Sequence, residues 1–394
     1  MSDPVALRRG MAEELTSSGE LDPGWREAFL AVPRHAFIPD LIWRQQRGDL
    51  VPFRRADDPE GWLHLAYAPR QFLITQVDDG LPVGPGLIGD RISSSASQPD
   101  VVALMLAALD VEPGMRVCEI GTGTGYNAAL LAYRLGAQNL TTIEVDATLA
   151  DRARDVLVGA GYPDVMVITG DGAQGYPPRA PYDRVLSTVA AQHVPYAWVA
   201  QTRPGGRVVT PWGTAFLNGT LLALTVSEDG TATGRLVGAV AFMWLRDQRI
   251  PFTRVRDFVY DEDKALISHT SLHPDLLTGN NHTALAIGLR VPSCEYRHCR
   301  ATDGSGEGTL WFLDHLSRSW ASLDYIPGAG TFEINQLGPR RLWDEVEAAY
   351  AWWVQAGSPT AEKWRFTLTP DGLHASLDDM QLEAGSTCWL GASL

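Results

Sequence analysis

Two acidic residues and three glycines about a third of the way along the chain could together hold a small ligand. Residues 119–126 read EIGTGTGY, so Glu119 directly precedes a turn with glycines at every second position. Glycine at such a turn leaves backbone N–H groups open to a bound molecule. A second acidic residue, Glu144, follows about 20 residues later, where a carboxylate commonly binds ribose hydroxyls. The pattern therefore indicates a site for a nucleoside-containing ligand.

The spacing of the glycines distinguishes between such ligands. A dinucleotide site would require Gly-x-Gly-x-x-Gly, and Tyr126 stands where its third glycine would fall. A carboxylate at Glu119, just before the turn, suits a cationic or amine-bearing ligand better than a pyrophosphate. S-adenosylmethionine has a sulfonium, an amino group and a ribose, so we expect it as the cofactor. A turn that serves only helix–strand packing is the alternative.

The elements around this turn predict an α/β fold with a doubly wound, Rossmann-like parallel sheet. The apolar run 115–120 predicts a buried strand, and 126–135 has helical spacing up to Gly136. We expect further strands at 140–144, 165–169, 183–188 and 207–211, and hairpin strands at 221–226 and 236–242. Asp171 then lies at the carboxyl edge of the sheet, where ligands bind in open α/β folds. Asp171 is expected to contact adenine, although an exposed Asp-Gly turn would also explain it.

The serine-rich segment 93–100, which reads SSSASQPD, could bind an anion. Pro99 is expected to start a buried helix that runs to Leu109, with Ser97 as its N-cap. Free N–H groups, the helix dipole and the hydroxyls of Ser94, Ser95 and Ser97 would together seat a substrate carboxylate.

The first 95 residues predict helices and irregular connections. Residues 1–50 look helical, with amphipathic segments at 6–17 and 25–32, and the segment 32–39 (VPRHAFIP) reads as a rigid corner. Short strands are expected at 66–68 and 72–76. Residues 54–61 read as a polar loop, and the glycine- and proline-rich residues 78–90 as a mobile loop that could form a lid.

Composition excludes several classes of partner. The chain has 394 residues and a formal net charge of −15, which argues against nucleic acid and against an acidic membrane surface as partners. We find no signal peptide or membrane-spanning run, and four cysteines without an export signal predict a reduced, cytoplasmic protein. Cys294, His298 and Cys299 lie close together but lack further ligands, so we expect no metal.

The last third of the chain predicts an additional C-terminal α+β domain that is rich in tryptophan. A helix is expected at 342–356, and strands at 364–369 and 373–377 flank a turn signal. The tryptophans are expected in its core. Arg340 and Arg341 could bind an acidic peptide, unless they form a solvated face. We therefore expect an N-terminal substrate-side region (1–95), a cofactor-binding core (96–245) and an accessory substrate-recognition domain (246–394).

Five motifs resemble those of protein-L-isoaspartate O-methyltransferases in order and spacing, over roughly residues 5–225. They are VPR at 32–34 with Phe37 and Pro39, SASQP at 95–99, EIGTGTGY at 119–126, GDG at 170–172 and PGGR at 204–207. The resemblance implies a carboxyl O-methyltransferase of class I fold that uses S-adenosylmethionine. It assigns catalysis to Ser97. It assigns the cofactor to Glu119, Gly121, Gly123, Glu144, Asp171 and Gly172. Beyond the resemblance, we expect Ser95 to take part in catalysis and Ser94 and Thr188 to bind substrate. We also expect cofactor contacts from Thr122, Gly125 and Tyr126.

Two features of the sequence depart from the usual pattern of that family and resemble one of its branches. The segment between Tyr67 and Ser93 is longer than usual, and the chain continues well past the usual end. Both features resemble the branch associated with ribosomally synthesised modified peptides, such as lanthipeptides and graspetides. That branch implies methylation of an aspartate in a macrocyclic precursor peptide, followed by collapse of the ester to an aspartimide. A repair enzyme for isoaspartate and a non-catalytic peptide-binding protein are the alternatives.

Overall fold

The computed structural model describes residues 2–46, 48–81, 88–251, 254–377 and 388–390. The chain divides into two compact units, which we describe separately. The first unit contains residues 1–190, 195–211 and 221–233, and the second contains residues 191–194, 212–220 and 234–394. The expected domain boundaries at 95/96 and 245/246 stay a prediction.

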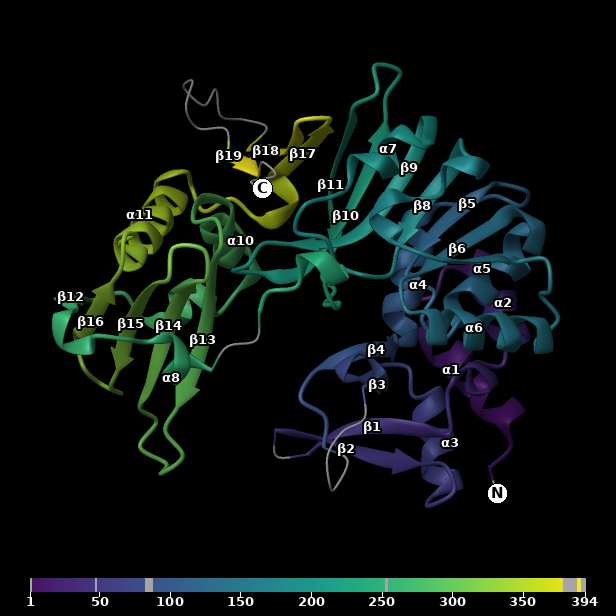
Figure 1. The fold of residues 1–394 in the computed structure, drawn as a ribbon, viewed down its shortest axis with the longest axis horizontal. Helices are drawn as coiled ribbons and strands as arrows, with labels where there is room; N and C mark the ends of the chain where they lie inside the picture. Colours follow the sequence, from purple (N-terminus) through teal and green to yellow (C-terminus); the bar gives the residue numbers. More distant parts are fainter. Residues whose placement is uncertain (1, 47, 82–87, 252–253, 378–387, 391–394) are drawn as a thin grey trace. The chain divides into compact units, whose positions relative to one another are not determined.

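A parallel sheet forms the centre of the first unit (Figure 1). Its strands are β5 (Val117–Ile120), β6 (Leu140–Glu144), β7 (Met166–Thr169), β8 (Tyr182–Ser187) and β9 (Thr202–Gly213). They lie in the order β9-β8-β5-β6-β7, and the sheet continues beyond β9 with β10 (Asn218–Val226) and β11 (Ala232–Gly238). The strand order reverses direction at β5, which lies between β6 and β8. This is the doubly wound fold that the sequence predicts.

The register of these strands aligns their carboxyl ends. Ile120 at the end of β5 pairs with Ile143 on β6 and with Ser187 on β8. Every residue of β5 and β6 is buried, as expected for parallel strands covered on both faces. The helices are α4 (Pro99–Leu109), α5 (Tyr126–Leu135), α6 (Ala147–Gly159) and α7 (Tyr196–Ala200); α4 contacts β8, and α5 and α6 contact β6. The residues that follow β5, β6 and β8 therefore meet at one edge.

A small antiparallel sheet and three helices make up the N-terminal part of this unit. The sheet has the order β2-β1-β3-β4, with β1 (Leu41–Gln46), β2 (Asp49–Arg54), β3 (Leu73–Val77) and β4 (Ile92–Ala96). The helices are α1 (Pro4–Ser17), α2 (Arg26–Ala31) and α3 (Pro59–Tyr67). Part of the expected lid loop, residues 82–87, lies outside the described residues.

Two sequence-based expectations for this part are wrong. Residues 41–46 form a strand instead of a helix, and pair along their length with β2. Residues 66–67 end helix α3 instead of forming a strand, because Asp58 caps that helix and Pro59 occupies its first turn. These start signals lie inside the segment 54–61, whose polar composition predicts a loop.

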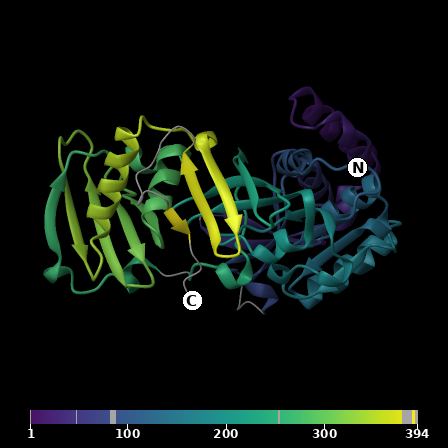
Figure 2. The same cartoon turned by 90° about the horizontal axis from the view of Figure 1, so that it is seen from above.

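The second unit is the predicted α+β part of the chain. Its five-stranded antiparallel sheet has the order β12-β16-β15-β14-β13, with β12 (Leu266–Thr270), β13 (Cys294–Arg300), β14 (Gly308–Asp314), β15 (Ser319–Tyr325) and β16 (Phe332–Leu337). Helix α11 (Leu342–Gln355) packs on β14 and β15, and α10 (Asn281–Arg290) packs on α11 (Figure 2). The expected hairpin forms as β17 (Trp364–Thr369) and β18 (Gly372–Leu377), and β18 also pairs with β19 (Cys388–Leu390).

Tryptophans contribute to the core of this unit, as expected. Trp320, Trp343 and Trp364 are almost fully buried, and Trp343 packs against Phe312. Across the described part of the chain, no helix combines the length and the hydropathy that a bilayer crossing requires.

Candidate active site

The glycine turn follows β5 at the carboxyl edge of the parallel sheet. Gly121, Gly123 and Gly125 have φ values of +91°, +54° and +86°, which favour glycine. The turn is held against β6, because the N–H groups of Gly121 and Thr122 both donate to Ile143 O. The Thr122 side chain is buried, with its hydroxyl 2.7 Å from that of Thr142. The sequence-predicted turn therefore has the shape that brings backbone close to a ligand.

Glu144 lies beside this turn, at the end of β6. One of its oxygens accepts from Gly123 N at 2.9 Å, and the other accepts from Asp146 N at 3.1 Å. Asp146 in turn caps helix α6 through Thr148 N and Leu149 N. The carboxylate that was expected to bind ribose hydroxyls is thus in contact with the glycine turn.

Glu119 lies beneath the turn and has no exposed surface. Its oxygens accept from Asn127 Nδ2 and Thr142 Oγ1, both at 2.6 Å. Burial raises the pKa of this carboxyl from 4.5 to about 7, and the two hydrogen bonds oppose that rise. Glu119 therefore joins β5, α5 and β6, and its expected contact with the cofactor stays a prediction.

Asp171 and Gly172 follow β7 at the same edge. The exposed Asp171 carboxylate accepts from Ala173 N at 2.9 Å, so it forms the turn that its Asp-Gly pair predicts. A Cβ atom on Gly172 would lie 2.4 Å from Ile120 Cγ2 at the end of β5. Glycine is thus required for the close approach of this turn to the centre of the sheet.

Thr188 follows β8 and contacts the first glycine. Its hydroxyl donates to Gly121 O at 2.5 Å, and a Cβ atom on Gly121 would lie 2.6 Å from Thr188 Oγ1. Thr188 therefore fixes the start of the turn, and its expected contact with substrate stays a prediction.

The serine segment lies against the glycine turn from the other side. Ser94 on β4 is buried and its Oγ accepts from Thr75 Oγ1 at 3.1 Å. A Cβ atom on Gly123 would lie 3.8 Å from Ser94 Oγ and 3.9 Å from Ser95 O. The structure thus brings the expected substrate-side serines together with the expected cofactor turn.

The expectation that Ser97 caps helix α4 is wrong. The cap position is occupied by Gln98, whose side chain makes no capping bond. No hydrogen bond of Ser95 Oγ or Ser97 Oγ is found within the described residues, and both serines are partly exposed. Ser97 therefore lacks the competing capping role, and the expected contacts of both serines with substrate stay predictions.

Several residues around this site gave no separate signal in the sequence. Gln76 on β3 donates to Asp146 Oδ2 at 3.1 Å and accepts from Ser93 Oγ at 2.8 Å, so it ties the small sheet to helix α6. The buried Arg34, which sequence reasoning placed in a structural corner, donates to Ser97 O at 2.9 Å. Alternation of apolar and polar residues cannot indicate such partners, because they come from distant segments.

Three other expected site residues lie in different surroundings. Tyr126 starts helix α5 and is buried, with its ring 5.9 Å from the Arg34 guanidinium carbon. Arg340, in the second unit, pairs with Asp314 at 3.1 Å and with Glu345. These hydrogen bonds raise the pKa of Arg340. Arg341 is exposed at the start of α11, and the peptide contacts expected of both arginines stay predictions.

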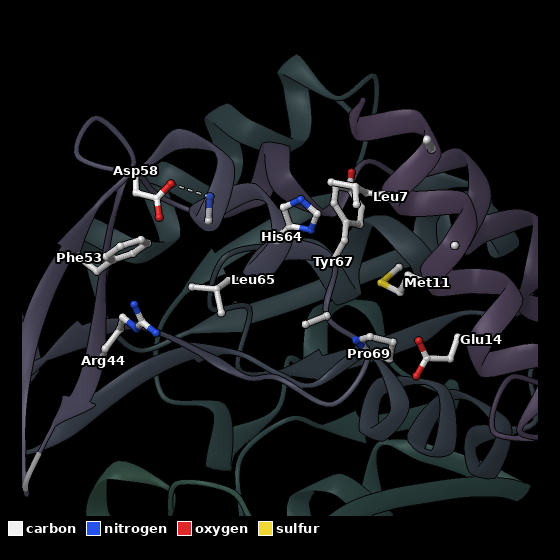
Figure 3. Close-up of a pocket in the computed structure, with 14 residues that line it drawn as sticks. Leu7, Met11, Glu14, Arg44, Phe53, Asp58, His64, Leu65, Tyr67 and Pro69 are labelled. Carbon is white, nitrogen blue, oxygen red and sulfur yellow. Dashed lines mark hydrogen bonds between the residues drawn. The ribbon is translucent and has the colours of Figure 1, made fainter. Parts of the chain in front are cut away.

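A separate groove of about 640 Å³ lies in the N-terminal part of the first unit (Figure 3). Arg44 and Phe53 lie on one side of it, with the Arg44 guanidinium 4.9 Å from the Phe53 ring, and Met11 and Glu14 lie on the other. None of its lining residues belongs to the expected site. Its wall at Pro69 is joined to the start of α4, since Asp100 N donates to Pro69 O at 3.2 Å.

The edge of the parallel sheet has the features that S-adenosylmethionine requires. Gly123 has no side chain, so its backbone faces Ser94 directly. A Cβ atom added to Gly123 would lie 3.8 Å from the Ser94 hydroxyl. Glu144 supplies a carboxylate directly beside this turn, and Asp171 supplies a second one at the next strand. Glu144 would hold the ribose hydroxyls, and Asp171 and Gly172 would lie beside the adenine.

Comparison with known proteins identifies the relatives of this chain. Residues 66–249 match the profile of the family described as protein-L-isoaspartate(D-aspartate) O-methyltransferase. Protein-L-isoaspartate O-methyltransferase 2 of Polaromonas sp. is 42% identical over 249 residues, which cover 63% of this chain and all of that protein. The Thermococcus onnurineus protein-L-isoaspartate O-methyltransferase is 38% identical, and the match covers 55% of this chain and 83% of that protein.

A solved structure titled protein-L-isoaspartate O-methyltransferase has the same fold. It is 19% identical, with a TM-score of 0.54, and the match covers 94% of this chain and 99% of that one. The expected carboxyl methyltransferase activity and the S-adenosylmethionine cofactor are confirmed, whereas the branch that acts on modified peptides stays a prediction. The chain therefore belongs to the protein-L-isoaspartate O-methyltransferase family of S-adenosylmethionine-dependent enzymes.

Proposed function

We propose that this chain esterifies the carboxylate of an aspartate-derived residue in a polypeptide. The observation that carries this proposal is the contact between the serine segment and the cofactor turn. Ser94 and Ser95 border the space above Gly123, and Ser97 follows two residues later with an uncommitted hydroxyl. A carboxylate bound by these hydroxyls would lie next to the cofactor.

The chemistry requires alignment more than activation. An aspartate-type carboxylate is already ionised near neutral pH, so no strong base is needed. S-adenosylmethionine supplies an electrophilic methyl group when it is bound. The enzyme's task is to direct one carboxylate oxygen toward that methyl, and positioning of this kind can supply roughly 7–11 kcal/mol. Ser97 would orient the carboxylate without binding it so tightly that the nucleophile loses reactivity.

The isoaspartyl residue of a damaged protein is our first candidate for the acceptor. The relatives from Polaromonas and Thermococcus carry the isoaspartate name, and one of them aligns over its whole length with this chain. The C-terminal unit is compatible with this candidate. A structure with the isoaspartate title covers 94% of the chain in fold, so an extension of this kind does not by itself exclude it.

An aspartate of a modified ribosomal peptide is the second candidate. What favours it is the unusual length of the segment between Tyr67 and Ser93, which resembles the branch that acts on modified peptides. This segment contains β3 and leads into β4, which holds the expected substrate-side serines. In this reaction the methyl ester forms first; the nitrogen of the next backbone amide then attacks the ester carbonyl and expels methanol. The products are a five-membered aspartimide and methanol, with the amide proton transferred to the leaving methoxide.

One experiment separates the two candidates. The full chain is incubated with S-adenosylmethionine and four peptides of one sequence: linear aspartyl, linear isoaspartyl, and the same two closed by a side-chain lactam. Methyl transfer appears as a mass gain of about 14 Da, and aspartimide as subsequent loss of methanol, because a methyl ester is an activated acyl group. A matched peptide with Asn in place of the acceptor is the control.

The acceptor that reacts decides the substrate class. Reaction of the linear isoaspartyl peptide alone supports the repair reaction. Reaction of the closed aspartyl peptide alone supports the modified-peptide reaction. If the Asn control forms as much S-adenosylhomocysteine as every acidic peptide, the proposed carboxyl methylation is wrong.

A further inference from the structure

We propose that Arg34 is a positioning residue that fixes Ser97 relative to the first turn of helix α5, the helix that follows the glycine turn. The inference deepens the proposed function, because it states what sets the distance between the substrate hydroxyl and the methyl donor. Arg34 does not touch the glycine turn, so its effect would act through the main chain of the serine segment.

The guanidinium of Arg34 donates hydrogen bonds to carbonyl groups of three separate segments. Nη2 donates to Ser97 O at 2.9 Å and to Ala96 O at 3.3 Å, at the end of β4. Nη1 donates to Ala66 O at 2.5 Å in helix α3, and Nη2 also reaches Gln71 O at 3.4 Å, just before β3. One side chain therefore holds the carbonyl of the proposed catalytic serine and the two segments that lead into the small sheet.

The same guanidinium contacts the cofactor side of the site. Its central carbon lies 5.9 Å from the centroid of the Tyr126 ring. Tyr126 is buried and is the first residue of α5, directly after Gly125 of the turn. Arg34 thus lies between the start of α5 and the serine segment, and a shift of its side chain would change their separation.

Burial of the Arg34 guanidinium costs more free energy than burial of an apolar side chain that served packing alone. The residue has no exposed surface, and no ion pair is found for it within the described residues. Burial lowers its pKa from 12.5 to about 10, so the group remains charged near neutral pH. A buried charge is expensive unless hydrogen bonds compensate it. Here main-chain carbonyls accept from both terminal nitrogens and the Tyr126 ring lies beside the guanidinium, whereas no partner of Nε is found within the described residues.

Arginine suits this task because its donors form a rigid, planar fork. The fork fixes several carbonyls in one geometry, whereas the ammonium of lysine is a single charged centre on a flexible stem. The segment that Arg34 holds through Ala66 and Gln71 also forms one wall of the groove in Figure 3, which includes Pro69.

Arg184 provides a matched control within the same unit. It is 7% exposed and donates to Leu109 O and Asp110 O, both at 2.8 Å, so it too is an arginine that binds main-chain carbonyls. Arg184 pairs with Val117 at the start of β5, the opposite end of the strand from the glycine turn. Its acceptors lie at the C-terminal end of α4, whereas the serine segment precedes the N-terminal end of that helix, so Arg184→Lys removes a buried arginine's hydrogen bonds at a site away from the serines.

The first measurement does not depend on any methyl transfer. Hydrogen exchange is followed in Arg34→Lys and Arg184→Lys, with and without S-adenosylmethionine. We expect Arg34→Lys to accelerate exchange of the amides in residues 93–98, and Arg184→Lys to leave this segment unchanged. Equal acceleration in both variants, or none in Arg34→Lys, would overturn the proposal. Because no substrate is present, this result stands even if the chain methylates none of the peptides above.

The second measurement links Arg34 to turnover. We expect Arg34→Lys to lower kcat by about 10- to 100-fold, as misplacement by an ångström can do, while the Kd for S-adenosylmethionine changes less than about threefold. The losses from Arg34→Lys and Ser97→Ala should be strongly non-additive, since both act through one serine. Additive losses, or parallel losses of kcat and cofactor affinity, would assign Arg34 to stability instead. If Arg34→Lys does not fold, Arg34→Gln is measured in the same way. Failure of both to fold while Arg184→Lys folds would also refute a positioning role.

Discussion

The Ser94 hydroxyl lies 3.8 Å from the point that a Cβ atom on Gly123 would occupy. Ser94 belongs to the small antiparallel sheet, and Gly123 belongs to the turn after the central strand of the parallel sheet. The two sheets of the first unit therefore meet at this pair. A cofactor that uses the turn and a substrate that uses the serines would be neighbours there.

A methyl group at position 123 should weaken cofactor binding. Gly123 has φ of +54°, so Gly123→Ala adds about 1–2 kcal/mol of backbone strain and places a methyl beside the backbone that the ligand approaches. We expect the Kd for S-adenosylmethionine, measured by calorimetry, to rise at least tenfold. Gly114→Ala is the control, because Gly114 has φ of +84° and nothing lies within 4 Å of its Cβ position. An equal loss of affinity in the two variants would mean that strain alone is responsible.

Removal of the Ser97 hydroxyl should slow turnover and leave folding nearly unchanged. Ser97 does not cap α4, so Ser97→Ala should change the free energy of unfolding by less than about 0.5 kcal/mol, against about 1 kcal/mol for a lost cap. We expect kcat to fall and the Kd for S-adenosylmethionine to remain the same. Urea unfolding, steady-state kinetics and calorimetry measure the three quantities. Parallel losses of kcat and cofactor affinity would contradict the proposed contact with substrate.

Neutralising Glu144 should reduce affinity for the cofactor. Hydrogen bonds to a charged group contribute about 1.5–3 kcal/mol each, so Glu144→Gln should weaken S-adenosylmethionine binding by about 10- to 100-fold. The effect should be larger than in Asp151→Asn, a change at an exposed carboxylate of α6 whose only described ion pair is with Arg154. Calorimetry with S-adenosylhomocysteine tests the same contact without turnover. Unchanged affinity in Glu144→Gln would remove this residue from the proposed site.

Glu119 should make the stability of the first unit depend on pH. Burial raises its pKa from 4.5 to about 7, so the folded state binds this proton more tightly than the unfolded state. The stabilisation is fully present below about pH 4.5 and is lost as pH rises through about 7, a change of about 3 kcal/mol.

Glu119→Gln should remove this dependence. The amide can still accept from Asn127, and the Thr142 hydroxyl can reorient to accept from it. Urea unfolding between pH 5 and 8 should therefore show the variant gaining stability relative to the wild type as pH rises. A constant difference across this range would show that Glu119 keeps the same protonation state throughout it.

The sequence by itself determined the local architecture of the site. The apolar run before EIGTGTGY, the alternating glycines and the helical spacing after them specify a strand, a turn and a helix through short-range geometry. The hairpin at residues 364–377 was predicted for the same reason. Two local predictions were wrong. The polar composition around Asp58 predicts a loop, although Asp58 caps helix α3. Ser97 is a favourable N-cap residue, but Gln98 occupies the cap position of α4.

Only the tertiary structure decided what lies against these elements. The partners of Arg34 are main-chain carbonyls, which every residue possesses, so no residue type marks them in advance. Likewise, Ser94 and Gly123 come from different sheets, and nothing local in either segment specifies their contact. Glu119 reads as a ligand contact in the sequence, but its burial between β5, α5 and β6 decides its protonation. Periodicity reports which face of an element is buried, whereas burial, charge and proximity at a site depend on how distant segments pack together.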